Sequence, residues 1–191
     1  GCPRPILPLT GDKTAIDGAI DGMVAYPAMG TFIPNGLIWG WHVLSPNEPF
    51  TQGIEEGNEY YEETIKAVVL LSDGENSVTA TNNHNKSIFN GYNYSNLQVD
   101  GTYRLGGSTA STATTNLSAK TAALCANVKQ AGIRLYTVTF GSIPTAAQDL
   151  MRNCATDHKG APLYFHAPTN NELDDAFAEI GKDLNELHVA L

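Results

Sequence analysis

The chain has 191 residues, 42% of them hydrophobic and 8% aromatic, and a formal net charge of −9 at pH 7. This length and composition are ordinary for one globular domain with a buried core. No stripe of Lys and Arg offers a surface for phosphates, so we expect no nucleic-acid partner. No apolar run reaches the roughly eighteen residues that a membrane-spanning helix needs. Membrane contact is therefore expected only through an anchor outside this sequence.

The first part of the chain predicts a sheet-edge segment and two helices. Residues 5–10 are apolar but include two prolines, which restricts an extended segment to the edge of a sheet. Asp12 is suited to cap a helix in which apolar residues recur at helical spacing from Ile16 to Val24, with the acidic residues left in water. Pro34 suits the first turn of a second helix that continues to Leu44.

An acidic loop follows the second helix. Its five glutamates lack the alternating spacing and the glycine of a calcium-binding loop, so a solvated loop is favoured over a calcium site. These residues are Glu55, Glu56, Glu59, Glu62 and Glu63.

The most informative segment is the apolar run over residues 67–71, which follows Lys66 and stops at Ser72-Asp73-Gly74. Such a run is typical of a buried parallel strand that places a carboxylate at its C-terminal end, where open α/β sheets bind ligands. Upstream, Thr31 places a hydroxyl at a glycine turn before a helix. Thr31 and Asp73 are therefore candidate metal ligands for one hard divalent cation. The alternative is that both only shape the chain locally, Asp73 by accepting backbone N–H bonds and Thr31 by capping a helix.

Residues 77–116 form a long insertion rich in Ser, Thr, Asn and Gly. A structureless insertion of this length in a compact domain is either functional or mobile. Its scattered aromatic residues, together with Asn and Ser, give it the composition of a recognition surface. The sequence allows two interpretations of this segment, a binding surface or a loop without a function. The aromatic residues are Phe89, Tyr92, Tyr94 and Tyr103.

The remaining sequence alternates helix and strand. It predicts a helix from Ser118 to Ala131, a strand over 133–140, a short helix through 148–151 and a strand over 163–166. Thr169 and Glu172 form a capping box that begins a C-terminal helix. This alternation is the signature of an α/β fold with a mostly parallel sheet covered on both faces, and we expect a single domain.

Two of the three cysteines lie in neighbouring helical segments that are separated by one strand. Cys125 and Cys154 can therefore form a disulfide, and two buried free thiols are the alternative. Cys2 is left without a partner in the sequence.

Besides binding a metal ion for ligand recognition, Asp73 has a second candidate role, which is catalysis. A carboxylate at the end of a strand suits a nucleophile or metal ligand in phosphoryl transfer. The chain has no phosphate-binding glycine loop ending in Lys, no second aspartate two residues after Asp73, and no pair of histidines at helical ligand spacing. We therefore expect that this chain is not an enzyme. A hydrolase that catalyses phosphoryl transfer through Asp73 is the less favoured alternative.

Five stretches in the same order resemble the von Willebrand factor A domain, and within that family the TadG-like proteins of bacterial tight-adherence (Flp) pilus assembly. The resemblance implies a Rossmann-like, three-layer α/β/α fold and a non-enzymatic adhesion module. Family members bind a magnesium-like ion (Mg, or Mn or Ca) through an Asp-x-Ser-x-Ser loop, a threonine and an aspartate. Thr31 matches that threonine and Asp73 that aspartate, and a carboxylate of a protein ligand fills the open position. The stretches are residues 5–10, 30–41, 69–76, 132–140 and 150–155.

The chain departs from this family because Asp-x-Ser-x-Ser is absent from it. By the family's order the first strands should precede Cys2, so residues 1–191 are expected to be one partial domain that lacks them, with its metal site empty. The strand that ends at Asp73 would then expose its edge. We expect this edge either to form a homodimer or to be covered by residues 5–10.

The resemblance also implies a location and a redox state. The full-length protein would be anchored in the inner membrane, with this domain in the periplasm or at the cell surface. That setting is oxidising, which favours the Cys125–Cys154 disulfide. A metal-free structural scaffold of the pilus machinery is the alternative to a ligand-binding module.

Overall fold

A parallel sheet of three strands forms the centre of the structure, a computed structural model that describes residues 4–24, 30–82, 84–94, 98–99 and 102–186. The strands lie in the order β1-β6-β9, and they are β1 (Ala67–Ser72), β6 (Arg134–Phe140) and β9 (Tyr164–Ala167). Val68 pairs with Leu135, and Val138 pairs with Phe165. The chain is thus mixed α/β with a parallel sheet.

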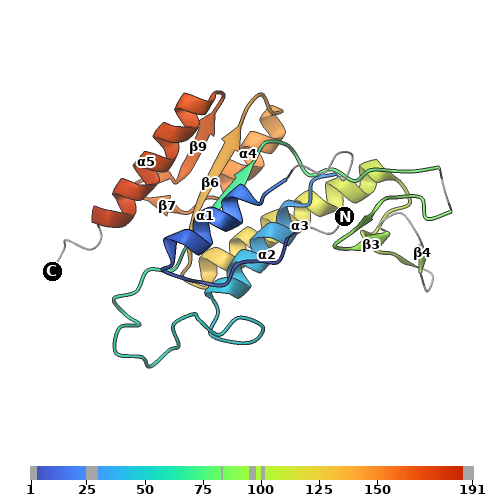
Figure 1. Ribbon diagram of the computed structural model, residues 1–191. Helices are drawn as coiled ribbons and strands as arrows, with labels where there is room; N and C mark the ends of the chain where they lie inside the picture. The colour runs from blue at the N-terminus through green and yellow to red at the C-terminus, as the bar shows by residue number, and fades with distance from the viewer. Residues whose placement is uncertain (1–3, 25–29, 83, 95–97, 100–101, 187–191) are drawn as a thin grey trace.

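Helices cover both faces of this sheet. On one face, α2 (Ile33–Leu44), α3 (Ala110–Gln130) and α4 (Thr145–Cys154) pack on Leu70 and Leu135. On the other face, α5 (Asn170–Glu186) packs on Tyr136 and Val138. Figure 1 shows α4 and α5 on opposite sides of β6 and β9. Alternate residues of the central strand β6 therefore face opposite sides of the sheet, with Leu135 in one apolar core and Tyr136 and Val138 in the other.

Several predicted helix ends are confirmed. The carboxylate of Asp12 accepts hydrogen bonds from the backbone N–H groups of Thr14 and Ala15 at 2.9 and 3.3 Å, and so caps α1 (Lys13–Asp21). Pro34 lies in the first turn of α2. Glu172 accepts hydrogen bonds from the backbone N–H and the hydroxyl of Thr169 at 3.0 and 2.9 Å, so this pair begins α5.

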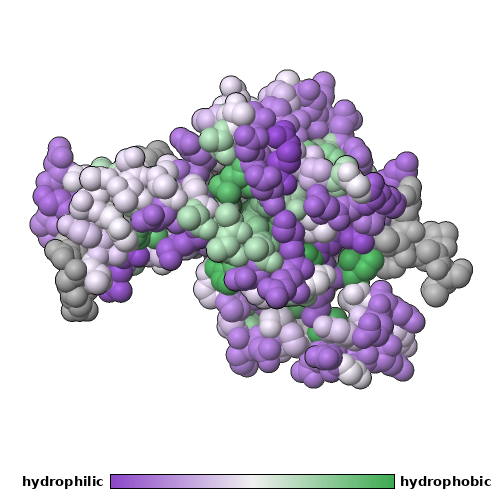
Figure 2. Space-filling view, turned by 180° about the vertical axis from the view of Figure 1, so that it is seen from behind, coloured by the Kyte–Doolittle hydropathy of each residue, from purple (hydrophilic) through white to green (hydrophobic). Residues whose placement is uncertain are grey.

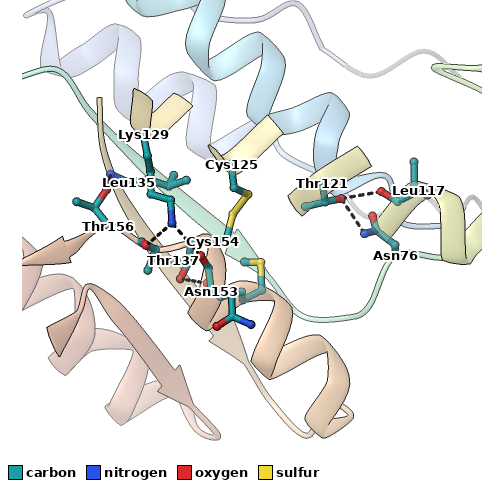
Figure 3. The surroundings of a disulfide bond; sticks show 12 residues. Asn76, Leu117, Thr121, Cys125, Lys129, Leu135, Thr137, Asn153, Cys154 and Thr156 are labelled. Atoms are coloured by element: carbon teal, nitrogen blue, oxygen red, sulfur yellow. Dashed lines mark hydrogen bonds between the residues drawn. A yellow bond between two sulfur atoms is a disulfide. The ribbon is translucent and has the colours of Figure 1, made fainter. Parts of the chain in front are cut away.

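A disulfide joins α3 to α4 beside the sheet. Cys125 and Cys154 are bonded, their Cα atoms are 5.1 Å apart, and both are buried. Lys129 of α3 donates to the carbonyls of Asn153 and Ala155 at 2.9 and 3.0 Å. These carbonyls lie at the C-terminal end of α4, where the helix itself supplies no hydrogen-bond donor for them. Figure 3 shows the disulfide and Lys129 reaching α4 from the same helix. These contacts fix α3 and α4 to each other by both covalent and polar bonds.

The predicted insertion over 77–116 is shorter and more ordered than expected. Helix α3 begins at Ala110, eight residues before the predicted start at Ser118, and Thr109 caps it by accepting from the N–H of Thr112 at 3.1 Å. Residues 77–109 contain two short hairpins and pack Val78 and Leu105 against the first half of α3. The hairpins are β2 (Phe89–Asn90) with β3 (Asn93–Tyr94), and β4 (Gln98–Val99) with β5 (Thr102–Tyr103).

The N-terminal predictions about packing are wrong. Residues 5–10 form no strand, and Ile6 instead lies in a shallow groove on the outer side of α2. Helix α1 forms but buries none of its residues, so its apolar stripe from Ile16 onward faces solvent. An amphipathic pattern shows that a helix has an apolar side, but not that a partner is present to cover it.

The remaining elements complete the surface. A hairpin of β7 (Asp157–His158) and β8 (Ala161–Pro162) joins α4 to β9. No helix within the described ranges is long and apolar enough to cross a membrane. Seen from behind, the surface is mostly polar with a patch of apolar residues near its middle (Figure 2).

Candidate functional site

The loops that carry Thr31 and Asp73 meet at the carboxyl end of β1. Asp73 directly follows this strand, and the hydroxyl oxygen of Thr31 lies 3.9 Å from the position that a Cβ on Gly74 would occupy. The structure therefore brings the two predicted ligands to one edge of the sheet, where α/β folds bind ligands.

Backbone bonds connect the two loops that carry these residues. Thr31 N–H donates to the carbonyl of Ser77 at 3.1 Å and to its hydroxyl at 2.9 Å, and Ser77 N–H donates back to the carbonyl of Thr31 at 2.9 Å. Gly30 precedes this bridge with φ +75°, and a Cβ there would lie 2.6 Å from the carbonyl oxygen of Ser77. Only glycine fits both the conformation and the space, so the glycine turn is what lets Thr31 approach.

Asn76 holds this edge in place, and sequence reasoning missed it. It is 1% exposed, and its Oδ1 accepts from the N–H of Ile33, the first residue of α2, at 3.0 Å. Its amide nitrogen donates to the hydroxyls of Thr121 and Ser118 in α3 at 2.9 and 3.3 Å. Figure 3 shows the Asn76 amide directed at Thr121. One buried side chain therefore fixes the loop after β1 to both α2 and α3.

Neither of the purely local roles considered for Thr31 and Asp73 is observed. The turn after β1 is closed by Ser72, whose hydroxyl donates to the carbonyl of Gly74 at 2.8 Å and accepts from its N–H at 3.3 Å. The N-cap of α2 is Phe32, without a side-chain cap bond. Within the part of the chain that the structure describes, neither the Asp73 carboxylate nor the Thr31 hydroxyl has a hydrogen-bond or ion-pair partner. No described residue therefore competes with a ligand for either oxygen.

A crevice of about 500 Å³, lined by both polar and apolar side chains, adjoins the same loop. It lies between the loop after β1, α3 and α4, and the carboxylate of Asp149 in it is paired with Arg152 at 2.9 Å. A crevice of this size can accept a side chain of a partner near the loop that carries Asp73. Its lining includes Glu75, Asn76, Ser118, Asp149 and Asn153.

The site fits a hard cation in the type of its ligands but not in their number. Carboxylate and hydroxyl oxygens are what Mg²⁺ and Ca²⁺ prefer. However, no group of three or more His, Cys, Asp and Glu is arranged to hold a metal ion among residues with a described position. Two protein oxygens leave most of an octahedral shell to water, so a cation held by Thr31 and Asp73 alone would be weakly bound.

The acidic loop is exposed, as a solvated loop should be. All five of its glutamates are exposed. Lys66 attaches the loop to the start of β1 by donating to the carbonyl of Ile54 at 3.0 Å and by lying 5.2 Å above the ring of Tyr61. The glutamates of this loop compete with the candidate site for any cation that binds by charge alone.

A second polar cluster lies on the α5 side of the sheet, near the start of β6. Tyr136 donates to the Asp183 carboxylate at 2.6 Å, and Arg134 and His158 approach the same carboxylate at 3.6 and 3.9 Å. Burial, and then the hydrogen bond to Asp183, raise the pKa of Tyr136. These groups connect α5 to β6 at the strand end opposite Asp73.

Comparison with known protein families, with curated proteins and with solved structures finds no match to this chain.

Proposed function

We propose that this chain is part of a non-enzymatic binding domain of the von Willebrand factor A type, in a TadG-like protein of tight-adherence pilus assembly. The three strands β1, β6 and β9 would be the later strands of that Rossmann-like fold. The partner would be a protein ligand that docks at the carboxyl end of β1. The five sequence stretches named above and the parallel sheet with helices on both faces support this proposal.

The observation that carries the proposal is the position of Thr31 beside Asp73. These residues are 42 positions apart in the sequence, yet a glycine turn, a backbone bridge and a buried asparagine hold their loops together. Ordering the two loops that carry these oxygen groups costs conformational entropy. A ligand that uses both groups explains this arrangement.

Thr31 and Asp73 would hold a divalent cation there, Mg²⁺ in the first instance. Such an ion supplies an open coordination position that a carboxylate of the partner fills. The remaining ligands would come from an Asp-x-Ser-x-Ser loop upstream of this sequence. Asn76 would keep the Thr31 loop and the Asp73 loop at a fixed separation.

The proposed location is the periplasm or the cell surface, with an upstream inner-membrane anchor. The Cys125–Cys154 disulfide supports an oxidising compartment, because such bonds persist mainly outside the cytosol.

Calorimetric titration of Mg²⁺ and Mn²⁺ tests the proposal. We expect weak binding to the 191-residue chain and tighter binding to a longer chain that carries the Asp-x-Ser-x-Ser loop. Thr31→Ala and Asp73→Asn should each weaken the binding to the longer chain by at least about tenfold, because each removes or neutralises an oxygen ligand.

Glu75→Gln is the matched control, since it removes an exposed carboxylate two residues from Asp73 without changing either ligand. Binding that survives Asp73→Asn, or that falls equally in Glu75→Gln, contradicts the proposal. If titration of Mg²⁺ or Mn²⁺ into the longer parent chain releases no heat, the metal-free scaffold is supported instead. The small number of metal ligands among the described residues favours this alternative.

A further inference from the structure

A pocket of about 410 Å³ opens on the insertion, between the β2–β3 hairpin and the turn after β5. The ring of Tyr92 in this pocket lies 6.3 Å from the ring of Phe32, measured between centroids, and Phe32 directly follows Thr31. One aromatic contact therefore links the pocket to the candidate site. The lining residues are Gly91, Tyr92, Asn93 and Arg104.

The insertion begins at the candidate site itself. Ser77 forms the backbone bridge to Thr31, and the next residue, Val78, belongs to the apolar cluster that contains Leu105 and against which Tyr92 packs. Leu105 directly follows Arg104. A packed core therefore holds the pocket beside the candidate site.

The backbone around Arg104 is ordered by contacts on both sides. Gly106 N–H donates to the carbonyl of Tyr103 at 2.9 Å, which closes a turn that contains Arg104. Leu105 is 1% exposed, and its carbonyl accepts from the side-chain amide of Asn116 in α3 at 2.7 Å. Because the turn is already ordered, only the side chain of Arg104 has to be immobilised when a ligand binds.

The hairpin wall of the pocket is also ordered and carries hydrogen-bond donors. Tyr92 N–H donates to Oδ1 of Asn90 at 2.8 Å, and a Cβ on Gly91 would clash with the side chain of Asn35 in α2. Burial raises the pKa of Tyr92, so its hydroxyl stays protonated and can donate. Oδ1 of Asn93 accepts from the N–H of the next residue at 2.8 Å, which leaves its NH₂ group as a donor.

Arg104 supplies the charge of this pocket. It is exposed and, among the residues with a described position, it takes part in no hydrogen bond or ion pair. Residues 77–109 include the basic residues Lys86 and Arg104 and one acidic residue, Asp100, whereas the whole chain has a formal charge of −9. The insertion therefore favours an anionic group, which the rest of this acidic chain repels.

We propose that this pocket binds a second carboxylate of the protein ligand, through an ion pair with Arg104 and hydrogen bonds from Tyr92 and Asn93. The ligand is then an acidic segment that places one carboxylate on the cation and another on the insertion. A planar guanidinium suits this role because it can donate two parallel hydrogen bonds to a carboxylate. Only the first of the two contacts rests on the proposed function.

A synthetic peptide of alternating Glu and Gly tests the pocket when it is titrated into the 191-residue chain. The ¹H–¹⁵N spectra are recorded in a buffer freed of divalent cations on a chelating resin. The amide signals of Tyr92, Asn93 and Arg104 should shift, and salt should weaken the binding. Arg104→Gln should raise the Kd roughly three- to fivefold, the effect of losing one exposed charge pair. Arg104→Lys keeps the charge without the planar fork, so its Kd should lie between the two.

Lys120→Gln is the matched control, because it removes one positive charge from the exposed surface of α3 and Lys120 does not line the pocket. It should leave the Kd for the peptide unchanged. The same peptide with Gln in place of Glu should shift none of the three signals. Circular dichroism of each variant shows whether it is folded.

Three results overturn the proposal. One is equal binding of the Glu peptide by the parent chain and by Arg104→Gln. Another is equal binding of the Glu and Gln peptides. The third is an oligogalacturonate that binds at lower concentration than the Glu peptide, which would make the pocket a site for an acidic glycan. Failure of the metal site would appear in the calorimetry of the longer chain and would leave the metal-free shifts at Arg104 unchanged, so the two failures are distinguishable.

Discussion

Replacing both Cys125 and Cys154 with alanine is expected to lower the free energy of unfolding by about 3 kcal/mol. The bond closes a loop with a sequence separation of 29 residues, and both cysteines are buried in the core under α3 and α4. Without it the unfolded chain gains loop entropy, and α4 is held to α3 only by packing and by Lys129. Urea unfolding followed by circular dichroism measures the change.

Two comparisons separate the covalent bond from the packing. The parent chain treated with a reductant loses the bond but keeps both sulfur atoms, so its stability should fall less than that of the double alanine variant. Cys2→Ser leaves the pair intact and serves as the control. An unfolding midpoint that changes neither on reduction nor in the alanine variant would show that the disulfide does not stabilise this fold.

Asn76→Ala is expected to lower the free energy of unfolding by about 2 kcal/mol and to loosen the candidate site. The substitution leaves the buried N–H of Ile33 without an acceptor, and such an orphaned group costs roughly 1–3 kcal/mol. It also frees the loop after β1 from Thr121 of α3. Amide exchange at Ile33 and urea unfolding measure the two effects.

Asn47→Ala is the matched control, because Asn47 is exposed and, among the described residues, its side-chain amide bonds only to nearby Ser45. It should change the stability by less than about 0.5 kcal/mol. If Asn76→Ala behaves like this control, or if Ile33 stays protected in it, Asn76 does not hold α2 to the loop.

The strands, and the end of β1 at which Asp73 lies, could be predicted because their signals are local. An apolar run that stops at Ser-Asp-Gly predicts both a buried strand and the end at which its carboxylate lies. The alternation of helix and strand then predicts a parallel sheet, whose carboxyl edge gathers such groups. Thr31 and Asp73 were placed at one edge by this general rule together with the family resemblance.

Asn76 could not be found in the same way. Its partners are Ile33, Ser118 and Thr121, all more than 40 residues away. One asparagine after a strand predicts a turn, and nothing in its sequence neighbourhood indicates that its side chain is buried. Its role follows only from the tertiary packing of α2 and α3.

The errors in the helices have two physical causes. The early start of α3 was hidden because residues 110–117 are mostly Ser, Thr and Ala, which give a weak apolar period, although Ala113 and Leu117 are fully buried. Helix α1 was predicted correctly as a helix but wrongly as a packed one, because its amphipathic pattern carries no information about a partner.

Line broadening by Mn²⁺ in a ¹H–¹⁵N spectrum of the 191-residue chain is the most direct test of the candidate site. A paramagnetic ion broadens the signals of the amides nearest to it, even when it binds weakly. We predict selective loss of the Thr31 and Gly74 signals at low Mn²⁺, and their return in Asp73→Asn. Loss that begins instead at the acidic loop over residues 55–63, and is unchanged in Asp73→Asn, would contradict a cation site at Thr31 and Asp73.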